Sequence, residues 1–176
     1  MKHIINTSKK PSLPFNGATI ELHEDMGEID WSKQSPVLHL EPEQTTGVLA
    51  GSELSKRMRG KSYNATVLDY LMEHQDQIPE VWKEKTKDCY TQVIYFWGTI
   101  FRSAGGNLCV RLLYWHDGRW RFYYRWLDDG CGGGNPAACP ASSSSPVPKP
   151  SQTLDPLTLI GKVYKDSEGK LVIKLD

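Results

Sequence analysis

The sequence predicts an α+β protein in which two short helices pack on an aromatic-rich antiparallel β-meander. Residues 93–102, 108–115 and 119–127 are runs of β-branched and aromatic residues, which are typical of strands. Two earlier segments, 53–59 and the one that begins at Asn64, carry helix start signals. The 176 residues, 39% hydrophobic and 24% charged, suffice for one ordinary domain with appendages.

By composition the chain divides into an acidic N-terminal extension with short strands, a helical segment, an antiparallel sheet, a linker and a terminal β-hairpin. In chain order these are residues 1–48, 49–88, 89–141, 142–154 and 155–176. We expect 49–141 to form one core domain. The linker is predicted because serine and proline dominate it, and such stretches cannot build a packed core.

The helix boundaries follow from capping residues. Ser52 is a candidate N-cap for 53–59, and Gly60 a candidate stop. The second helix begins at Asn64 and carries an apolar stripe at helical spacing, formed by Val67, Leu68 and Leu71. Pro79 limits it. Two tryptophans outside the strands, Trp31 and Trp82, are expected to anchor their segments in the core.

The register of the meander follows from Asp117-Gly118, the strongest short hairpin signal in the chain. A type I′ turn needs positive φ at both central residues, which aspartate and glycine tolerate. This turn predicts the cross-strand pairs Trp115 with Trp120, Leu113 with Phe122, Arg111 with Tyr124, and Cys109 with Trp126.

Alternation along the two strands then assigns the side chains to two faces. One face is predicted to be core: Cys109, Leu113, Trp115, Trp120, Phe122, Tyr124 and Trp126. The other carries Leu108, Val110 and Leu112 together with a polar set. We name that set the arginine–tyrosine face, and it consists of Tyr114, Arg119, Arg121, Tyr123 and Arg125.

Charge is segregated along the chain although the net charge is zero. Residues 93–127 contain five arginines and Asp117, a net of +4, whereas residues 21–43 contain seven carboxylates and Lys33, a net of −6. Such segregation can steer a partner, or it can let the two segments pair with each other. The sequence leaves open whether residues 21–43 cover the arginine–tyrosine face.

The favoured function is non-enzymatic binding through the arginine–tyrosine face. Tyrosine and arginine are the usual anchors of protein interfaces, so a protein partner with an acidic segment is the first expectation. Single-stranded nucleic acid is the alternative, because bases stack on aromatic rings while arginines track phosphates. No cofactor is expected.

A small hydrolase is the rival from another class. Cys131 lies in a glycine-rich stretch that could expose a thiol, with His116 as the nearest candidate base. Asp128 and Asp129 are a possible carboxylate pair at a strand end. No metal site is expected, because Cys131 and Cys139 lack the two closely spaced pairs of a structural zinc motif.

Neither a signal peptide nor a run of about 20 apolar residues is present, so the sequence predicts a cytoplasmic protein with no membrane partner. The four cysteines are unevenly spaced and indicate no disulfide framework.

Two groups of sequence blocks carry a resemblance. The first comprises ELSKRMRGK at 53–61, NATVLDYL at 64–71 and IPEVWK at 78–83. The second comprises YFWGTIFR at 95–102, LCVRLLYW at 108–115, GRW at 118–120, RWL at 125–127 and NPAA at 135–138. Together they resemble a recurring group of small bacterial proteins that have no assigned activity. The resemblance spans residues 15–141 and implies a bacterial source and a stable fold, but no chemistry.

Overall fold

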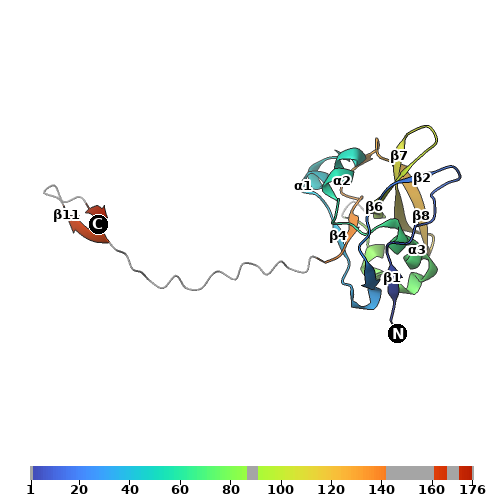
Figure 1. The fold of residues 1–176 in the computed structure, drawn as a ribbon, viewed down its shortest axis with the longest axis horizontal. Helices are drawn as coiled ribbons and strands as arrows, with labels where there is room; N and C mark the ends of the chain where they lie inside the picture. The colour runs from blue at the N-terminus through green and yellow to red at the C-terminus, as the bar shows by residue number, and fades with distance from the viewer. Residues whose placement is uncertain (1, 87–90, 142–160, 166–170, 176) are drawn as a thin grey trace. The chain divides into compact units, whose positions relative to one another are not determined.

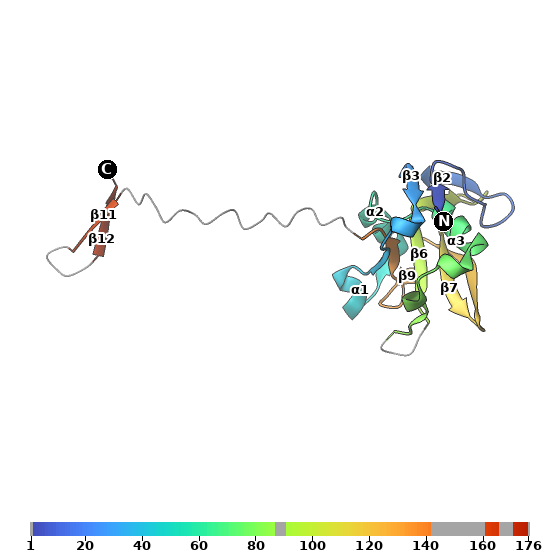
Figure 2. The same ribbon diagram turned by 90° about the horizontal axis from the view of Figure 1, so that it is seen from below.

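The computed structural model describes residues 2–86 and 91–141, and the backbone of 161–165 and 171–175. The chain forms two compact units, 1–142 and 143–176. In the second unit β11 (Gly161–Lys165) and β12 (Leu171–Leu175) pair as an antiparallel hairpin (Figure 2). The predicted linker, 142–154, lies outside the described residues.

The first unit is built on a six-stranded sheet, and the predicted α+β class is confirmed (Figure 1). The strand order is β4-β10-β6-β7-β8, with β2 also paired to β6. The bounds are β2 (Thr19–His23), β4 (Val37–His39), β6 (Val93–Arg102), β7 (Leu108–His116), β8 (Arg119–Trp126) and β10 (Ala137–Cys139). β6, β7 and β8 form the predicted antiparallel meander, and β10, which lies outside it, runs parallel to β6.

The acidic N-terminal residues belong to this unit. β2 extends the sheet along the second half of β6, and β4 pairs with β10. β1 (Ile4–Asn6) and β3 (Glu28–Asp30) form a separate two-stranded ladder. Trp31, in the 3₁₀ helix Trp31–Lys33, is buried and donates its indole N–H to the Gln77 carbonyl at 3.0 Å, as an anchor should.

The first predicted helix begins earlier than its capping signal indicates. After α1 (Pro42–Thr46), α2 spans Gly51–Arg57, and Ser52 is not its N-cap. The N–H groups of Gly51 and Ser52 instead donate to the carbonyls of Asp129 and Leu127, at 3.0 and 2.9 Å. Backbone carbonyls from the end of the sheet thus satisfy the helix terminus, so no side-chain cap is needed. β5 (Leu49–Ala50) pairs with β9 (Gly130–Cys131) at the same place.

The second predicted helix is confirmed. α3 spans Ala65–Glu73, and the Asn64 side chain accepts hydrogen bonds from the Thr66 and Val67 N–H groups. Its apolar stripe is buried. Two 3₁₀ turns follow, Gln75–Gln77 and Glu80–Lys83, and the second buries Trp82.

The predicted register between β7 and β8 is confirmed at all four pairs. Asp117 and Gly118 have φ of 50° and 73°, as a type I′ turn requires.

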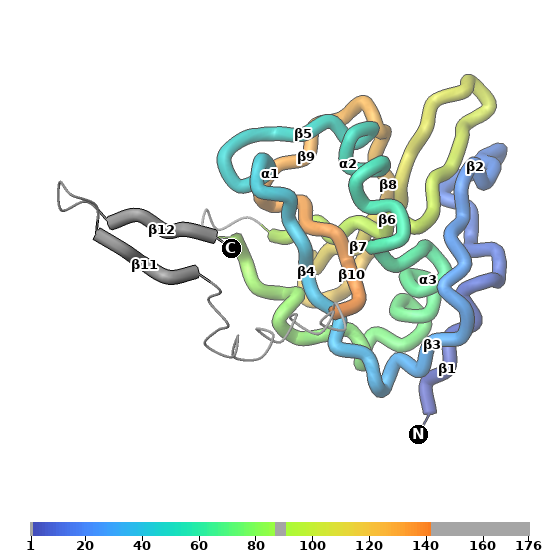
Figure 3. The backbone as a smooth tube through the Cα atoms, turned by 60° about the vertical axis from the view of Figure 1, so that its left-hand side comes forward, coloured from blue at the N-terminus to red at the C-terminus, as the bar shows by residue number. Residues whose placement is uncertain are grey.

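Different elements pack on the two faces of the sheet. α3 packs on one, in a cluster with Ile94, Phe96, Leu113 and Trp120. α2 and β9 pack on the other, over Tyr95, Trp97, Val110 and Leu112. Figure 3 shows α2, β5 and β9 gathered together, apart from α3. Neither group covers all of β8, and this leaves the candidate surface open.

Candidate binding surface

The arginine–tyrosine face lies along the edge of the sheet. β8 ends the strand order and, among the described residues, pairs with β7 alone. Tyr114 sits opposite Arg121, and Tyr123 opposite Leu112. On the β7 half of this face Val110 and Leu112 are buried under the α2 side, whereas on the β8 half Arg119, Tyr123 and Arg125 are exposed. The open part is therefore about one strand wide.

The arginines of this face have only weak internal partners. Arg121 lies 3.6 Å from the Asp117 carboxylate, and Arg125 lies 3.9 Å from that of Asp129. All four side chains are at least one-third exposed. Exposed pairs contribute little to stability, typically about 0–1 kcal/mol. The guanidinium groups can therefore take another carboxylate at small cost.

The acidic segment 21–43 does not neutralise this face. Glu21 forms a two-pronged ion pair with Arg102, at 2.7 Å for each bond, and Glu41 and Glu43 pair with Arg57. The hydrogen bonds from Arg102 lower the pKa of Glu21, and those from Arg57 lower the pKa of Glu43. Among the described residues, no carboxylate of segment 21–43 forms an ion pair with an arginine of the face, whose acidic neighbours are Asp117 and Asp129.

The prediction that Phe122 is core is wrong. Its side chain is 48% exposed, although its strand neighbour Trp120 is only 3% exposed. α3 covers the sheet as far as Trp120, whereas Phe122 lies over the guanidinium group of Arg111, 4.9 Å from the ring centre. Of the other predicted core residues, Trp115, Tyr124 and Trp126 are partly buried. Two consecutive aromatic side chains, Phe122 and Tyr123, are thus exposed at the middle of β8, Tyr123 by 58%.

A buried ion pair lies under this edge of the sheet and stabilises it. Arg111 is 2% exposed and donates to the Asp69 carboxylate at 2.6 Å and to the Ser12 carbonyl at 3.1 Å. The other Asp69 oxygen accepts the Ser12 N–H at 2.6 Å. The sequence alone does not predict this pair. Its one signal is an arginine at a core-facing strand position, since a buried charge requires a partner.

Cys131 does not lie in an open loop. It is a residue of β9, paired with Leu49 of β5, and only 2% of it is exposed. Burial raises the pKa of its thiol above the ordinary value. The candidate base, His116, lies at the tip of the β7–β8 hairpin, where its Nε2 is 3.1 Å from the Asp117 carboxylate. These features do not suit a nucleophile and its base.

We expect Cys131 to react slowly with iodoacetamide at neutral pH. A raised pKa leaves less thiolate at a given pH, and burial blocks approach of the reagent. The rate is measured peptide by peptide by mass spectrometry, with the chain unfolded in denaturant as the control. Labelling of Cys131 as fast in the folded chain as in the unfolded one would contradict its burial.

The two aspartates of the hydrolase hypothesis have ordinary surroundings. Asp128 is exposed, and Asp129 is partly buried with Arg125 near its carboxylate. The Asp129 carbonyl accepts a hydrogen bond from the Gly51 N–H at the start of α2. Their positions fit the end of a strand and the start of a helix. Within the described residues, no three His, Cys, Asp or Glu side chains are grouped as a metal site would require.

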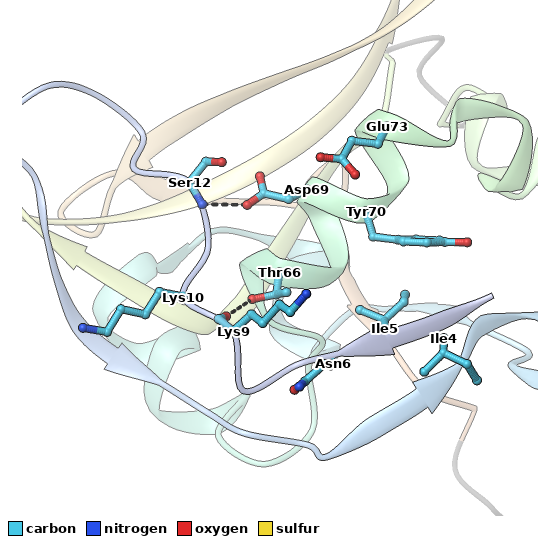
Figure 4. Close-up of a pocket in the computed structure, with 10 residues that line it drawn as sticks. All are labelled: Ile4, Ile5, Asn6, Lys9, Lys10, Ser12, Thr66, Asp69, Tyr70 and Glu73. Atoms are coloured by element: carbon cyan, nitrogen blue, oxygen red, sulfur yellow. Dashed lines mark hydrogen bonds between the residues drawn. The ribbon is translucent and has the colours of Figure 1, made fainter.

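Cavities also lie elsewhere on the described surface, and two of them are large enough to consider. One, of about 320 Å³, separates the N-terminal segment from α3, with Lys9 and Lys10 on one side and Asp69 and Glu73 on the other (Figure 4). Asp69 is already engaged by Ser12 and Arg111. The second, of about 690 Å³, lies between residues 44–48 and the glycines 133 and 134, and Lys85 is the one titratable residue of its lining. Neither cavity is lined by a cysteine or a histidine.

Comparison with family models, curated proteins and solved structures finds no match. In the described part of the chain, no helix has the length and apolar content needed to cross a bilayer.

Proposed function

We propose that this chain is a non-enzymatic binding module whose arginine–tyrosine face takes an acidic segment of a protein partner. The observation that carries the proposal is the state of β8, an edge strand that exposes arginines and aromatic rings. Arginine and tyrosine supply contact area together with charge and are common interface anchors.

The narrow width of the open surface favours a protein partner over single-stranded nucleic acid. Bases that stack successively need a platform of several accessible rings. Here the β7 half of the face is closed, and Tyr123 is the one ring of the face that is more than half exposed. An extended protein segment needs only the width of one strand.

A synthetic peptide in which glutamate alternates with valine is the probe. We expect it to bind, and we expect the double change Arg121→Gln and Arg125→Gln to weaken binding by about tenfold or more, because it removes two cations from the face. Arg59→Gln is the matched control, since Arg59 is exposed outside the face. Calorimetric titration at low and moderate salt measures both effects.

The outcome also separates the alternatives. Equal weakening by Arg59→Gln would show attraction by overall charge and would contradict a site on β8. Tighter binding of a single-stranded oligonucleotide, with a steep salt dependence removed by the Arg121 and Arg125 changes, would replace the protein partner with nucleic acid.

A further inference from the structure

We infer that the partner binds by strand addition, pairing its backbone with the edge of β8 that no described strand occupies; this inference rests on the proposed function. The occupant is an extended segment of another protein with carboxylates at alternate positions. Three features of β8 carry the inference: the direction of its backbone groups, the charge along it, and the exposure of its two faces.

The register shows which backbone groups of β8 are available. Its odd-numbered residues bond to β7, as Leu127 does where its N–H donates to the Leu108 carbonyl at 2.9 Å. In an antiparallel pair the bonding direction alternates. The N–H and C=O groups of Trp120, Phe122, Tyr124 and Trp126 therefore point away from β7. The Trp126 carbonyl accepts the Asp129 N–H at 3.2 Å, so within the described residues the section from Trp120 to Tyr124 is left for a partner.

The charges on β8 disfavour a second copy of the chain as the occupant. Antiparallel pairing of two β8 strands centred on Phe122 places Arg119 opposite Arg125. Centring on Tyr123 places Arg121 opposite Arg125. Like charges directly opposite each other destabilise a strand pair, and charged side chains are a known protection of edge strands against self-association. A strand that carries carboxylates at those positions is instead attracted by the arginines of β8.

The two faces of β8 define the side chains of the partner. On the arginine–tyrosine face, carboxylates spaced by strand alternation meet Arg121 and Arg125 on either side of Tyr123. On the other face, the partner meets the exposed ring of Phe122. The partly buried ring of Tyr124 packs against Phe15 and stacks on the Tyr123 ring, with ring centres 4.8 and 4.9 Å apart. Strand addition thus selects a segment in which acidic residues alternate with apolar ones.

Backbone methylation of the glutamate–valine probe tests this mode. In a paired strand only alternate N–H groups face β8, so methylating one alternate set should weaken binding about tenfold or more, while the other set changes it little. Equal effects of the two sets would overturn strand addition while leaving the binding site intact. No binding of the unmethylated probe would overturn the proposed function, and the inference with it.

A variant of the protein gives an independent readout. Phe122→Pro removes an outward N–H but no bond to β7, a position where edge strands tolerate proline. Phe122→Ala is the matched control, because it removes the ring and keeps the N–H. We expect the proline variant to bind the probe several-fold more weakly than the alanine variant. Equal affinities would overturn backbone pairing, provided that both variants show native circular dichroism.

Discussion

Replacing Asp69 with alanine is expected to lower the free energy of unfolding by about 3 kcal/mol. Arg111 is only 2% exposed, so loss of its carboxylate leaves a charge in the interior without a counter-ion. Removing one member of a buried pair typically costs about 3–5 kcal/mol, and we take the lower end because Asp69 is 22% exposed. The change also removes the acceptor of the Ser12 N–H and so loosens the N-terminal segment.

A second change distinguishes this cause from simple loss of contacts. Arg111→Met removes the stranded charge and fills similar volume, so the double variant Asp69→Ala and Arg111→Met should be more stable than Asp69→Ala alone. Urea unfolding of the two single variants and the double variant gives the coupling energy. If the losses in free energy of unfolding of the two single variants simply add in the double variant, the result would contradict stabilisation of this edge by a buried ion pair.

Trp120→Ala is expected to lower the free energy of unfolding by about 3–5 kcal/mol, as is usual for a large core side chain. Trp120 is 3% exposed, belongs to the α3-side core and packs edge-to-face on Trp115 with ring centres 5.3 Å apart. Trp126→Ala is the matched control on the same face of β8, and its loss should be smaller because Trp126 is only partly buried.

Urea unfolding measures both losses, with far-UV circular dichroism as the signal. A loss at Trp120 below about 1 kcal/mol, the level of an ordinary substitution, would contradict its place in the core. It would also show that the two faces of β8 are assigned the wrong way round.

Local signals account for the parts of the fold that the sequence predicts well. The Asp117-Gly118 turn determines its own geometry, and the register of β7 and β8 follows from it because pairing propagates residue by residue. Asn64 likewise satisfies the first turn of α3 with its own side chain. Both features depend on residues close together in the chain.

Contacts between distant segments account for the features that the sequence does not predict. β10 joins the sheet between β4 and β6, and no property of three residues predicts a parallel neighbour. Cys131 is buried because β5 pairs with its two-residue strand, whereas its glycine-rich neighbours indicate an open loop. Ser52 has the right chemistry for a cap, but distant carbonyls make that cap unnecessary.

For the candidate surface too, local signals predict one part of the structure and contacts between distant segments determine the rest. Alternation places its five residues on one face, and the structure agrees in the pairing of Tyr114 with Arg121. Alternation predicts a core position for Phe122 because it follows the same period as Trp120, but a strand at the edge of a sheet is covered only as far as its neighbouring elements reach. How far α3 extends along β8 depends on the tertiary fold.

The most direct test of the binding surface is to follow the amide chemical shifts of the nitrogen-labelled full chain while the glutamate–valine probe is added. We expect the largest changes at Phe122 and Tyr124, whose N–H groups face outward, with smaller changes at Arg121 and Arg125. Changes confined to the cavity between the N-terminal segment and α3, or no change at any residue, would contradict a binding surface on β8.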